Sequence, residues 1–341
     1  MTGHTALHRF DAGDVVLQSG RTFPGMHIAY STYGTLNADR SNVIVYPTSY
    51  NAQHTDTEWL VREGGILDTS QWFVVIPNLF GNGLSSSPSN TAWPLIGDRH
   101  PDVTYHDAVR VQQRLLAEVF GIETVQLAYG WSMGAMQAYH WASEFGDRVK
   151  RITVVCGAAR CAPHNRVFLD AVRTALTADP AWHDGVVRER PVRGIRAMGR
   201  LYASMALSQD FYRDELWRGI GFSSLADFLV RHWEATYARR DPADLLAQLW
   251  TWQHGDISDT PRFGGDLPAA LRAISARVLL MPGEQDLYFR VEDNRRELAH
   301  LRRGELKPMA SAWGHRAGNP TQSPADAALL RTAVHALLDS E

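Results

Sequence analysis

Short apolar stretches alternate with amphipathic stretches along much of the chain. Asp107 to Val119 carries apolar residues at helical spacing, and a second helix is expected to follow Ser132 and to run through Met136 to Phe145. Strands that alternate with helices predict an α/β fold with a mostly parallel sheet, covered by helices on both faces and binding ligands at the strands' carboxyl ends. Five apolar stretches, each ending in turn residues, are the predicted buried strands: Val43 to Tyr46, Phe73 to Ile76, Val125 to Ala128, Ile152 to Val155 and Val278 to Met281.

The pattern changes between about Cys161 and Leu271, where helical patterns occur and no clear strand is found. A helical segment inserted between strands is well placed to cover a pocket at the strand ends. We therefore divide the chain into a first core segment (1–160), a helical lid (161–271) and a second core segment (272–341). The predicted lid helices are Val167 to Leu176, Gly194 to Leu207, Leu225 to Tyr237 and Ala243 to Trp252. The lid tryptophans, most of them expected in helix-packing cores, are Trp182, Trp217, Trp233, Trp250 and Trp252.

Composition narrows the class of protein. Hydrophobic residues make up 45% and charged residues 21%, which is typical of a globular protein. The balance of 34 Lys+Arg against 37 Asp+Glu gives a net charge of -3 and does not favour nucleic-acid binding. No apolar run approaches the ~20 residues that cross a bilayer, residues 1–13 lack a signal-peptide pattern, and two cysteines are too few for a disulfide framework. We expect a cytoplasmic protein with no nucleic-acid or membrane partner.

A candidate nucleophile lies at a predicted turn between a strand and a helix. The segment Gly130-Trp131-Ser132-Met133-Gly134 has the pattern Gly-x-Ser-x-Gly. The pattern alone is weak, but a nucleophile elbow requires this context of apolar strand, sharp turn and helix start. The glycines allow the strand and the helix to approach closely, and the helix amino terminus favours negative charge beside the serine oxygen. An ordinary glycine-rich turn is the structural alternative.

A serine hydroxyl needs a general base, and the base needs an acid that orients it. Where the three residues follow the order Ser, Asp, His, the last third of this chain supplies both partners. Asp286 follows the predicted strand that ends at Met281, and His315 lies in a glycine-flanked loop before the last predicted helix. Alternatives with a less suitable position are His54, His106 and His140 for the base, and Glu284 and Asp293 for the acid.

Acyl transfer also needs two backbone N–H groups that stabilise an oxyanion. Met133, directly after the candidate nucleophile, is the first expected donor. The second is expected in the loop after the strand Val43 to Tyr46, where Ser49 is the preferred residue. Tyr50 and Asn51 in the same loop are expected to line the substrate pocket. A plain polar loop is the alternative interpretation.

Three segments of the chain resemble the homoserine O-acetyltransferase family of α/β-hydrolase-fold proteins. They are Pro77 to Ser86, which matches the family's Asn-x-x-Gly-x-x-x-Gly-Ser segment, Thr104 to Ile122, and Gly130 to Ala142. The resemblance implies an α/β-hydrolase fold, an acyl-enzyme intermediate and a helical lid that often mediates dimerisation. The family's Ser-Asp-His triad maps onto Ser132, Asp286 and His315.

Three departures from the family favour an esterase. Pro47 to Asn51 replaces a loop of His-Ala-Leu-Thr-Gly type, and Trp131 replaces a glycine, which adds bulk to the pocket beside Ser132. Ala206 to Gln209 replaces a Tyr-Arg pair that helps to hold the amino-acid substrate, with Arg213 as a nearby substitute. Because a zwitterion needs paired charges to enter a pocket, these changes make water the expected acyl acceptor.

We therefore expect a serine carboxylesterase that hydrolyses short-chain acyl esters such as acetates, with an acetyl-CoA-dependent O-acyltransferase as the alternative. A binding module built on a degenerate fold would lack a triad member, and none is missing. No cofactor or metal is expected, because no metal-ligand spacing or phosphate-binding loop occurs. Cys156 and Cys161 are expected to be packing residues, and His100 and His106 exposed loop residues. The resemblance implies a homodimer formed through the lid.

Overall fold

An eight-stranded sheet forms the centre of the computed structural model, which describes residues 6–91, 100–183 and 186–340. Its strands follow the order β1-β2-β4-β3-β5-β6-β9-β10. β2 pairs antiparallel with β1 and with β4, and every other neighbouring pair is parallel. The strands are β1 His8–Val16, β2 Thr22–Tyr33, β3 Val43–Val45, β4 Phe73–Pro77, β5 Leu127–Trp131, β6 Arg151–Val155, β9 Arg277–Met281 and β10 Gly304–Leu306.

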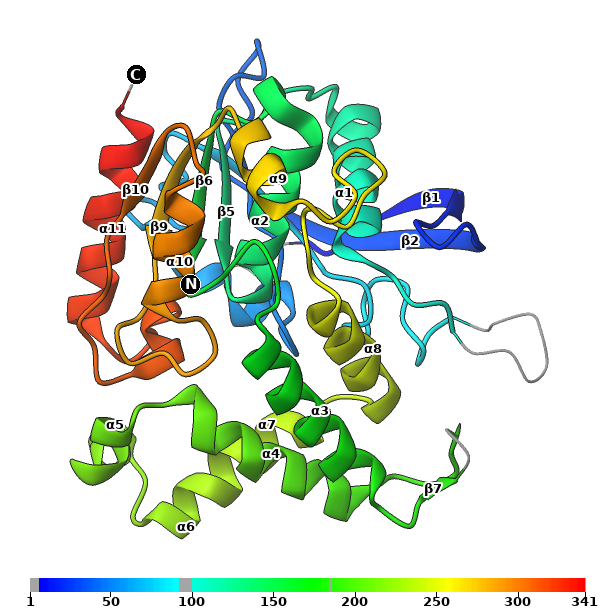
Figure 1. The fold of residues 1–341 in the computed structure, drawn as a ribbon, viewed down its shortest axis with the longest axis vertical. Helices are drawn as coiled ribbons and strands as arrows, with labels where there is room; N and C mark the ends of the chain where they lie inside the picture. The colour runs from blue at the N-terminus through cyan, green and yellow to red at the C-terminus, as the bar shows by residue number, and fades with distance from the viewer. Residues whose placement is uncertain (1–5, 92–99, 184–185, 341) are drawn as a thin grey trace.

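Both faces of the parallel part of the sheet are buried. Successive side chains of a strand point to opposite faces, so in β3 Val43 and Val45 join one hydrophobic cluster and Ile44 joins another. Helices α1 and α2 pack on the first face and α11 packs on the second (Figure 1). The helices of this core are α1 Tyr105–Phe120, α2 Met133–Phe145, α10 Val291–Leu298 and α11 Pro324–Leu338, with 3-10 turns at His54–Asp56, Glu58–Leu60, Gly146–Arg148 and Gly314–Gly318.

A helical insertion, defined here as residues 163–273, separates β6 from β9. Figure 1 shows α3 to α7 gathered beyond one end of the sheet. A π-helical turn, Leu229–Glu234, joins α6 to α7, so the three elements follow one another without a break. The helices are α3 Pro163–Thr177, α4 Val192–Ala206, α5 Gln209–Arg213, α6 Leu225–Phe228, α7 Ala235–Ala238, α8 Pro242–Gln253 and α9 Leu267–Ala273, with a 3-10 turn at Leu216–Ile220.

The α/β-hydrolase architecture predicted from the sequence is confirmed, with differences at its edges. The strand predicted at Val125 to Ala128 runs instead over Leu127–Trp131, because Val125 makes only an isolated bridge to Val149. The sequence pattern missed β1, β2 and β10, and it missed a short hairpin of Trp182–His183 and Val186–Val187 in the insertion. β1 is an edge strand with mostly exposed positions, so it lacks the apolar run that marks the central strands.

Three smaller sequence predictions concern membrane segments and isolated side chains. No helix among the described residues is long and apolar enough to cross a membrane; residues 1–5 of the predicted polar amino-terminal segment lie outside the described part. Cys156 and Cys161 are free and buried, as expected of packing residues. The prediction for His106 was wrong, because it lies in α1 with a mostly buried side chain 3.4 Å from the Glu144 carboxylate. His100 is also partly buried, against the ring of Phe23.

Candidate active site

Ser132 lies at a strained turn between β5 and α2. β5 ends at Trp131, α2 begins at Met133, and Ser132 between them has φ 58° and ψ -125°. A non-glycine residue with positive φ carries a conformational cost that the surrounding structure must offset. The two glycines of the pattern make this turn possible: a Cβ on Gly130 would lie 2.1 Å from the Gly134 carbonyl oxygen, and one on Gly134 would lie 2.7 Å from that of Pro47.

The structure brings Ser132, His315 and Asp286 together in one chain of hydrogen bonds. Oγ of Ser132 lies 2.9 Å from Nε2 of His315, and Nδ1 of His315 lies 2.7 Å from Oδ2 of Asp286. With the proton of the neutral imidazole on Nδ1, His315 donates to the carboxylate and accepts from the serine hydroxyl. All three side chains are buried. The fold brings them together from distant parts of the chain, since Ser132 and His315 are 183 residues apart in sequence and Asp286 and His315 are 29 apart.

The Asp286 carboxylate is fixed by backbone donors as well as by the imidazole. It lies in the loop after β9, where its Oδ1 accepts hydrogen bonds from the N–H groups of Tyr288 (2.7 Å) and Phe289 (3.2 Å). The loops of the acid and the base approach closely, because a Cβ on Gly283 would lie 2.9 Å from the Gly314 carbonyl oxygen. These hydrogen bonds fix the orientation of the Asp286 carboxylate, with Oδ2 directed towards His315.

The His315 ring is enclosed by three aromatic rings. The ring centroids of Trp131, Tyr288 and Phe289 lie 5.3, 4.7 and 5.7 Å from that of the imidazole. Trp131 also donates from Nε1 to the carbonyl oxygen of His315 at 3.2 Å. Trp131 therefore holds the turn that carries His315, in addition to lining the cavity as predicted.

The alternative bases and acids do not join this group. His54 pairs with Asn78, His106 with Glu144, and His140 lies against the ring of Tyr105. Among the acids, Glu284 is exposed and Asp293 lies on α10. No hydrogen bond connects any of these five candidates to Ser132 within the described residues.

The Ser49 side chain fastens the loop after β3 to the serine turn. Its hydroxyl donates to the carbonyl oxygen of Trp131 and accepts from the N–H of Gly134 at 3.3 Å. Since the hydroxyl is occupied, the group that Ser49 can offer to a ligand is its backbone N–H. Over the described ranges, the N–H groups of Ser49 and Met133 have no hydrogen-bond partner, as expected of groups available to an oxyanion.

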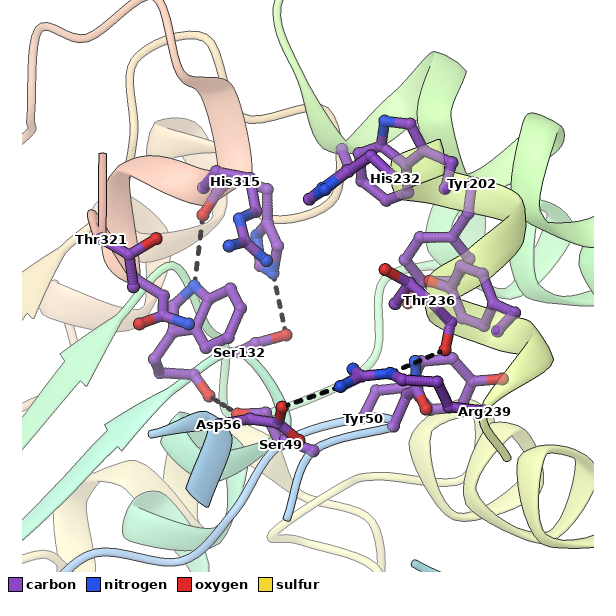
Figure 2. Close-up of a pocket in the computed structure, with 18 residues that line it drawn as sticks. Ser49, Tyr50, Asp56, Ser132, Tyr202, His232, Thr236, Arg239, His315 and Thr321 are labelled. Carbon is purple, nitrogen blue, oxygen red and sulfur yellow. Dashed lines mark hydrogen bonds and ion pairs between the residues drawn. The ribbon is translucent and has the colours of Figure 1, made fainter. Parts of the chain in front are cut away.

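A cavity of about 200 Å³ opens above Ser132, and both the core and the insertion line it. Figure 2 shows Ser132 and His315 on one side and Tyr202, His232 and Thr236 on the other. From the core, the lining residues are Ser49, Tyr50, Asn51, Ala52, Asp56, Trp131, Ser132, His315, Arg316, Asn319 and Thr321. From the insertion, they are Tyr202, Ala206, His232, Trp233, Thr236, Tyr237 and Arg239.

The predicted pocket residues Tyr50 and Asn51 do line this cavity. The Tyr50 ring stacks on Tyr202 with centroids 5.5 Å apart, and its hydroxyl donates to the Leu245 carbonyl oxygen at 3.2 Å. Asn51 has φ 60° and donates its N–H to Oε1 of Gln248 at 2.8 Å. Both residues therefore connect the oxyanion loop to the insertion.

Sequence reasoning missed the residues that the insertion contributes, and it misjudged Arg213. That side chain is 68% exposed, pairs with Asp210 at 2.6 Å and Asp214 at 3.1 Å, and does not line the cavity. The prediction that Arg213 could hold a substrate was wrong, because the turn of α5 directs it towards acidic neighbours. The spacing of His232, Trp233, Thr236 and Tyr237 along one helical face was the available signal for the lining residues.

The described residues contain one group with metal-ligand geometry, formed by Cys156, Asp286 and His315. Their ligand atoms lie within 4.8 Å of one another. However, the carboxylate and the imidazole already share a hydrogen bond, and burial raises the pKa of the Cys156 thiol well above its ordinary value. A protonated thiol is a poor ligand, so this donor set suits a hydrogen-bonded cluster better than a metal site.

Comparisons with known proteins show the family to which the chain belongs. The chain is 36% identical over 315 residues to the ethyl acetate hydrolase of Pseudomonas veronii, covering 92% of this chain and 90% of that protein. It is 30% identical over 357 residues to the homoserine O-acetyltransferase of Caulobacter vibrioides, covering 94% and 92%. The solved structure of the acetyl esterase MekB superposes with a TM-score of 0.94 at 35% identity, covering 99% and 98%. A family profile described as alpha/beta hydrolase fold matches residues 63–317, and the chain belongs to that family, in the branch that contains these esterase and homoserine O-acetyltransferase relatives.

Proposed function

We propose that the protein is a serine carboxylesterase that hydrolyses small acyl esters such as acetates. The observation that carries the proposal is the buried chain of hydrogen bonds from Ser132 through His315 to Asp286 at the floor of a small cavity. Relatives named as an ethyl acetate hydrolase and an acetyl esterase support the same reaction and the same acyl group.

In the first half of the reaction, Ser132 becomes acylated. Its Oγ attacks the ester carbonyl carbon while Nε2 of His315 accepts the hydroxyl proton. The negative charge that forms on the carbonyl oxygen is stabilised by the N–H groups of Met133 and Ser49. When the bond to the alcohol oxygen breaks, the imidazolium donates its proton to that oxygen, and the alcohol leaves. Asp286 keeps Nδ1 protonated and stabilises the imidazolium.

In the second half, water releases the acyl group. Nε2 of His315 accepts a proton from a water molecule that attacks the acyl carbon, and the proton returns to Oγ of Ser132 as the free acid leaves. Water is the proposed acceptor because an amino-acid alcohol would bring an ammonium group into the cavity. Asp56 is the carboxylate that lines the described cavity, and its oxygens already pair with Arg239 at 3.4 Å and Arg240 at 2.8 Å.

Acyl transfer from acetyl-CoA to an alcohol such as homoserine is the second candidate. The relative named as a homoserine O-acetyltransferase favours it, and the two activities share the acylation step. The candidates differ only in the acceptor that attacks the acyl-enzyme.

A paired assay decides between the two acceptors. The purified protein is incubated with ethyl acetate in water, and separately with acetyl-CoA and homoserine. We expect acetic acid and ethanol to form in the first reaction and little acetylhomoserine to form in the second. Rapid formation of free CoA and acetylhomoserine would assign the transferase activity instead. The variant Ser132→Ala is the control in both reactions, because it removes the acylated oxygen.

Location and assembly complete the proposal. The two buried free thiols, Cys156 and Cys161, are compatible with a reducing compartment, which supports a cytoplasmic location. A homodimer formed through the lid, predicted at residues 161–271, is proposed from the family resemblance. Sedimentation analysis of the purified protein tests it, with a monomer as the contradicting result.

A further inference from the structure

Arg316 is a cation in the cavity wall that has no acidic partner among the described residues. It follows His315 in the 3-10 turn Gly314–Gly318, and it lines the cavity above Ser132. Its guanidinium carbon lies 5.7 Å from the centroid of the Trp131 ring. Throughout the described part of the chain, this guanidinium forms no salt bridge and no hydrogen bond.

A lone cation–π contact does not satisfy a half-buried guanidinium. The group carries five N–H donors, and such a contact contributes only about 0.5–2 kcal/mol depending on exposure, whereas an unpaired charge removed from water is costly. Burial lowers the pKa of Arg316 from its ordinary value, but an arginine keeps its charge at neutral pH. A positive group held in a cavity without a partner is an available site for an anion.

The other charges around the cavity do not neutralise Arg316. The Asp56 carboxylate forms ion pairs with Arg239 and Arg240 and none with Arg316. Its negative charge favours the charged form of Arg316 only through a longer-range electrostatic interaction. His232 lines the same cavity and adds no negative charge; burial, together with the nearby Arg316 and Arg239, lowers its pKa to about 4, so it is neutral at pH 7. The charged side chains at this wall are therefore positive in sum.

Arg316 also marks the boundary of a second cavity. This cavity, of about 190 Å³, lies between the insertion and the segment around His315, and it shares His232, Trp233, Arg316, Asn319 and Thr321 with the first. Most of its other lining residues are apolar or aromatic: Leu207, Phe211, Ile220, Phe222, Phe228 and Trp313. A group that extends from the ester carbonyl towards this cavity passes the guanidinium.

We infer that Arg316 binds a carboxylate carried by the substrate, so that the preferred esters have one anionic end. The planar guanidinium can donate two parallel hydrogen bonds to a carboxylate, which fixes the orientation of the ester as well as adding affinity. A zwitterionic substrate fits less well, since its ammonium group would find Asp56 already paired. This inference rests on the proposed esterase activity and specifies its substrate class.

Two pairs of esters test the inference and locate the charge. In the first pair, 3-acetoxypropanoate and 3-acetoxypropanamide, the carboxylate or its neutral amide isostere is on the alcohol half. In the second pair, monoethyl succinate and ethyl succinamate, it is on the acyl half. For at least one pair we expect a kcat/KM about tenfold or more higher for the carboxylate, mainly through a lower KM, as a charge-assisted hydrogen bond predicts.

The Arg316 variants show whether that preference comes from this side chain. Arg316→Met should lower the carboxylate-to-amide ratio of kcat/KM about tenfold, and Arg316→Lys, which keeps a charge, should retain part of it. Because the carboxylate and amide esters are compared on the same enzyme preparation, the ratio of their kcat/KM values does not depend on the amount of folded enzyme. Arg213→Gln is the matched control, since that arginine lies on the surface with its own acidic partners. It should keep the wild-type ratio.

The outcomes separate this inference from the proposed function. If the wild type hydrolyses the amide esters but shows no carboxylate preference in either pair, the inference is wrong and the esterase activity stands. An unchanged ratio in Arg316→Met overturns it equally. If the wild type hydrolyses none of the four esters or ethyl acetate, the proposed function fails, and this inference fails with it.

Discussion

The two sides of the cavity are held in place by different forces. On the core side, Ser132, His315, Asp286 and Ser49 are each fixed by at least one hydrogen bond, and these bonds join four loops at one edge of the sheet. On the insertion side, the cavity is lined mainly by the rings of Tyr202, His232, Trp233 and Tyr237. The Tyr202 ring contacts those of Tyr50 and Tyr237 (Figure 2).

This difference separates the chemistry from the choice of substrate. Proton transfer needs donor and acceptor atoms near 3 Å apart, and a hydrogen-bonded scaffold can keep that distance. An aromatic wall excludes water and sets the shape of the cavity, but it fixes few orientations by itself. Substitutions of Ser132, His315, Asp286 or Ser49 should therefore lower kcat, whereas substitutions in the insertion should change KM and substrate preference more than kcat.

The largest effect is expected from Ser132→Ala. Removing the attacking oxygen leaves only binding and the oxyanion donors, so kcat for ethyl acetate should fall by about 10⁵-fold or more. The melting temperature should not fall, because alanine fits the turn as well as serine does. A rate within tenfold of the wild type would show that another group is acylated.

Asp286→Asn should reduce kcat by about 10⁴-fold. The amide keeps the shape of the carboxylate, but it can present an N–H to Nδ1 of His315, which favours the tautomer with its proton on Nε2. That tautomer cannot accept the proton of Ser132. The stopped-time hydrolysis of ethyl acetate measures the effect. An Asn variant with wild-type turnover would mean that the carboxylate is structural only.

Ser49→Ala tests the connection between the oxyanion loop and the serine turn. It removes a hydroxyl that contacts the Trp131 carbonyl and the Gly134 N–H, so we expect kcat to fall about tenfold with a small change in KM. Ser70→Ala, a change at an exposed serine outside the cavity, is the control for loss of a hydroxyl alone. Equal effects of the two substitutions would contradict the role given to Ser49.

The smallest effect is expected from the insertion. Thr236→Val is nearly isosteric and replaces a hydroxyl in the cavity wall by a methyl group. KM for a neutral ester should change by about two- to fivefold, and kcat should change less than KM. A fall in kcat larger than that of Ser49→Ala would remove the distinction between the two sides.

The core of this site could be predicted from the sequence because it depends on local order. The pattern around Ser132 encodes its own turn, since two glycines allow a close approach that no other residue permits. Asp286 follows β9, and His315 follows β10. Segments that follow parallel strands lie at the carboxyl ends of those strands, so the order of the chain places both residues at the same edge of the sheet. The central strands were predicted for a related reason, because burial on both faces produces continuous apolar runs.

The four helices predicted in the insertion agree with α3, α4, the run from α6 to α7, and α8, but the side chains that reach the cavity could not be predicted in the same way. Whether Arg213 or Arg316 faces the cavity depends on the rotation of a short helical turn against its neighbours, and that rotation is set by tertiary packing. Arg213 pairs with the carboxylates of Asp210 and Asp214, whereas Arg316 pairs with no carboxylate among the described residues. Sequence alone gives both as arginines in polar loops.

The edge strand β1 was missed because half of its surface faces solvent and its pattern resembles a loop.

Covalent labelling of the serine tests the central claim most directly. Diethyl 4-nitrophenyl phosphate transfers a diethylphosphoryl group to an activated serine oxygen and releases nitrophenol, and mass spectrometry of peptides locates the modified residue. We predict one equivalent of label on Ser132 of the wild type, no label on Ser132→Ala and slow labelling of Asp286→Asn. A label on another residue, or no reaction of the wild type, would contradict the account.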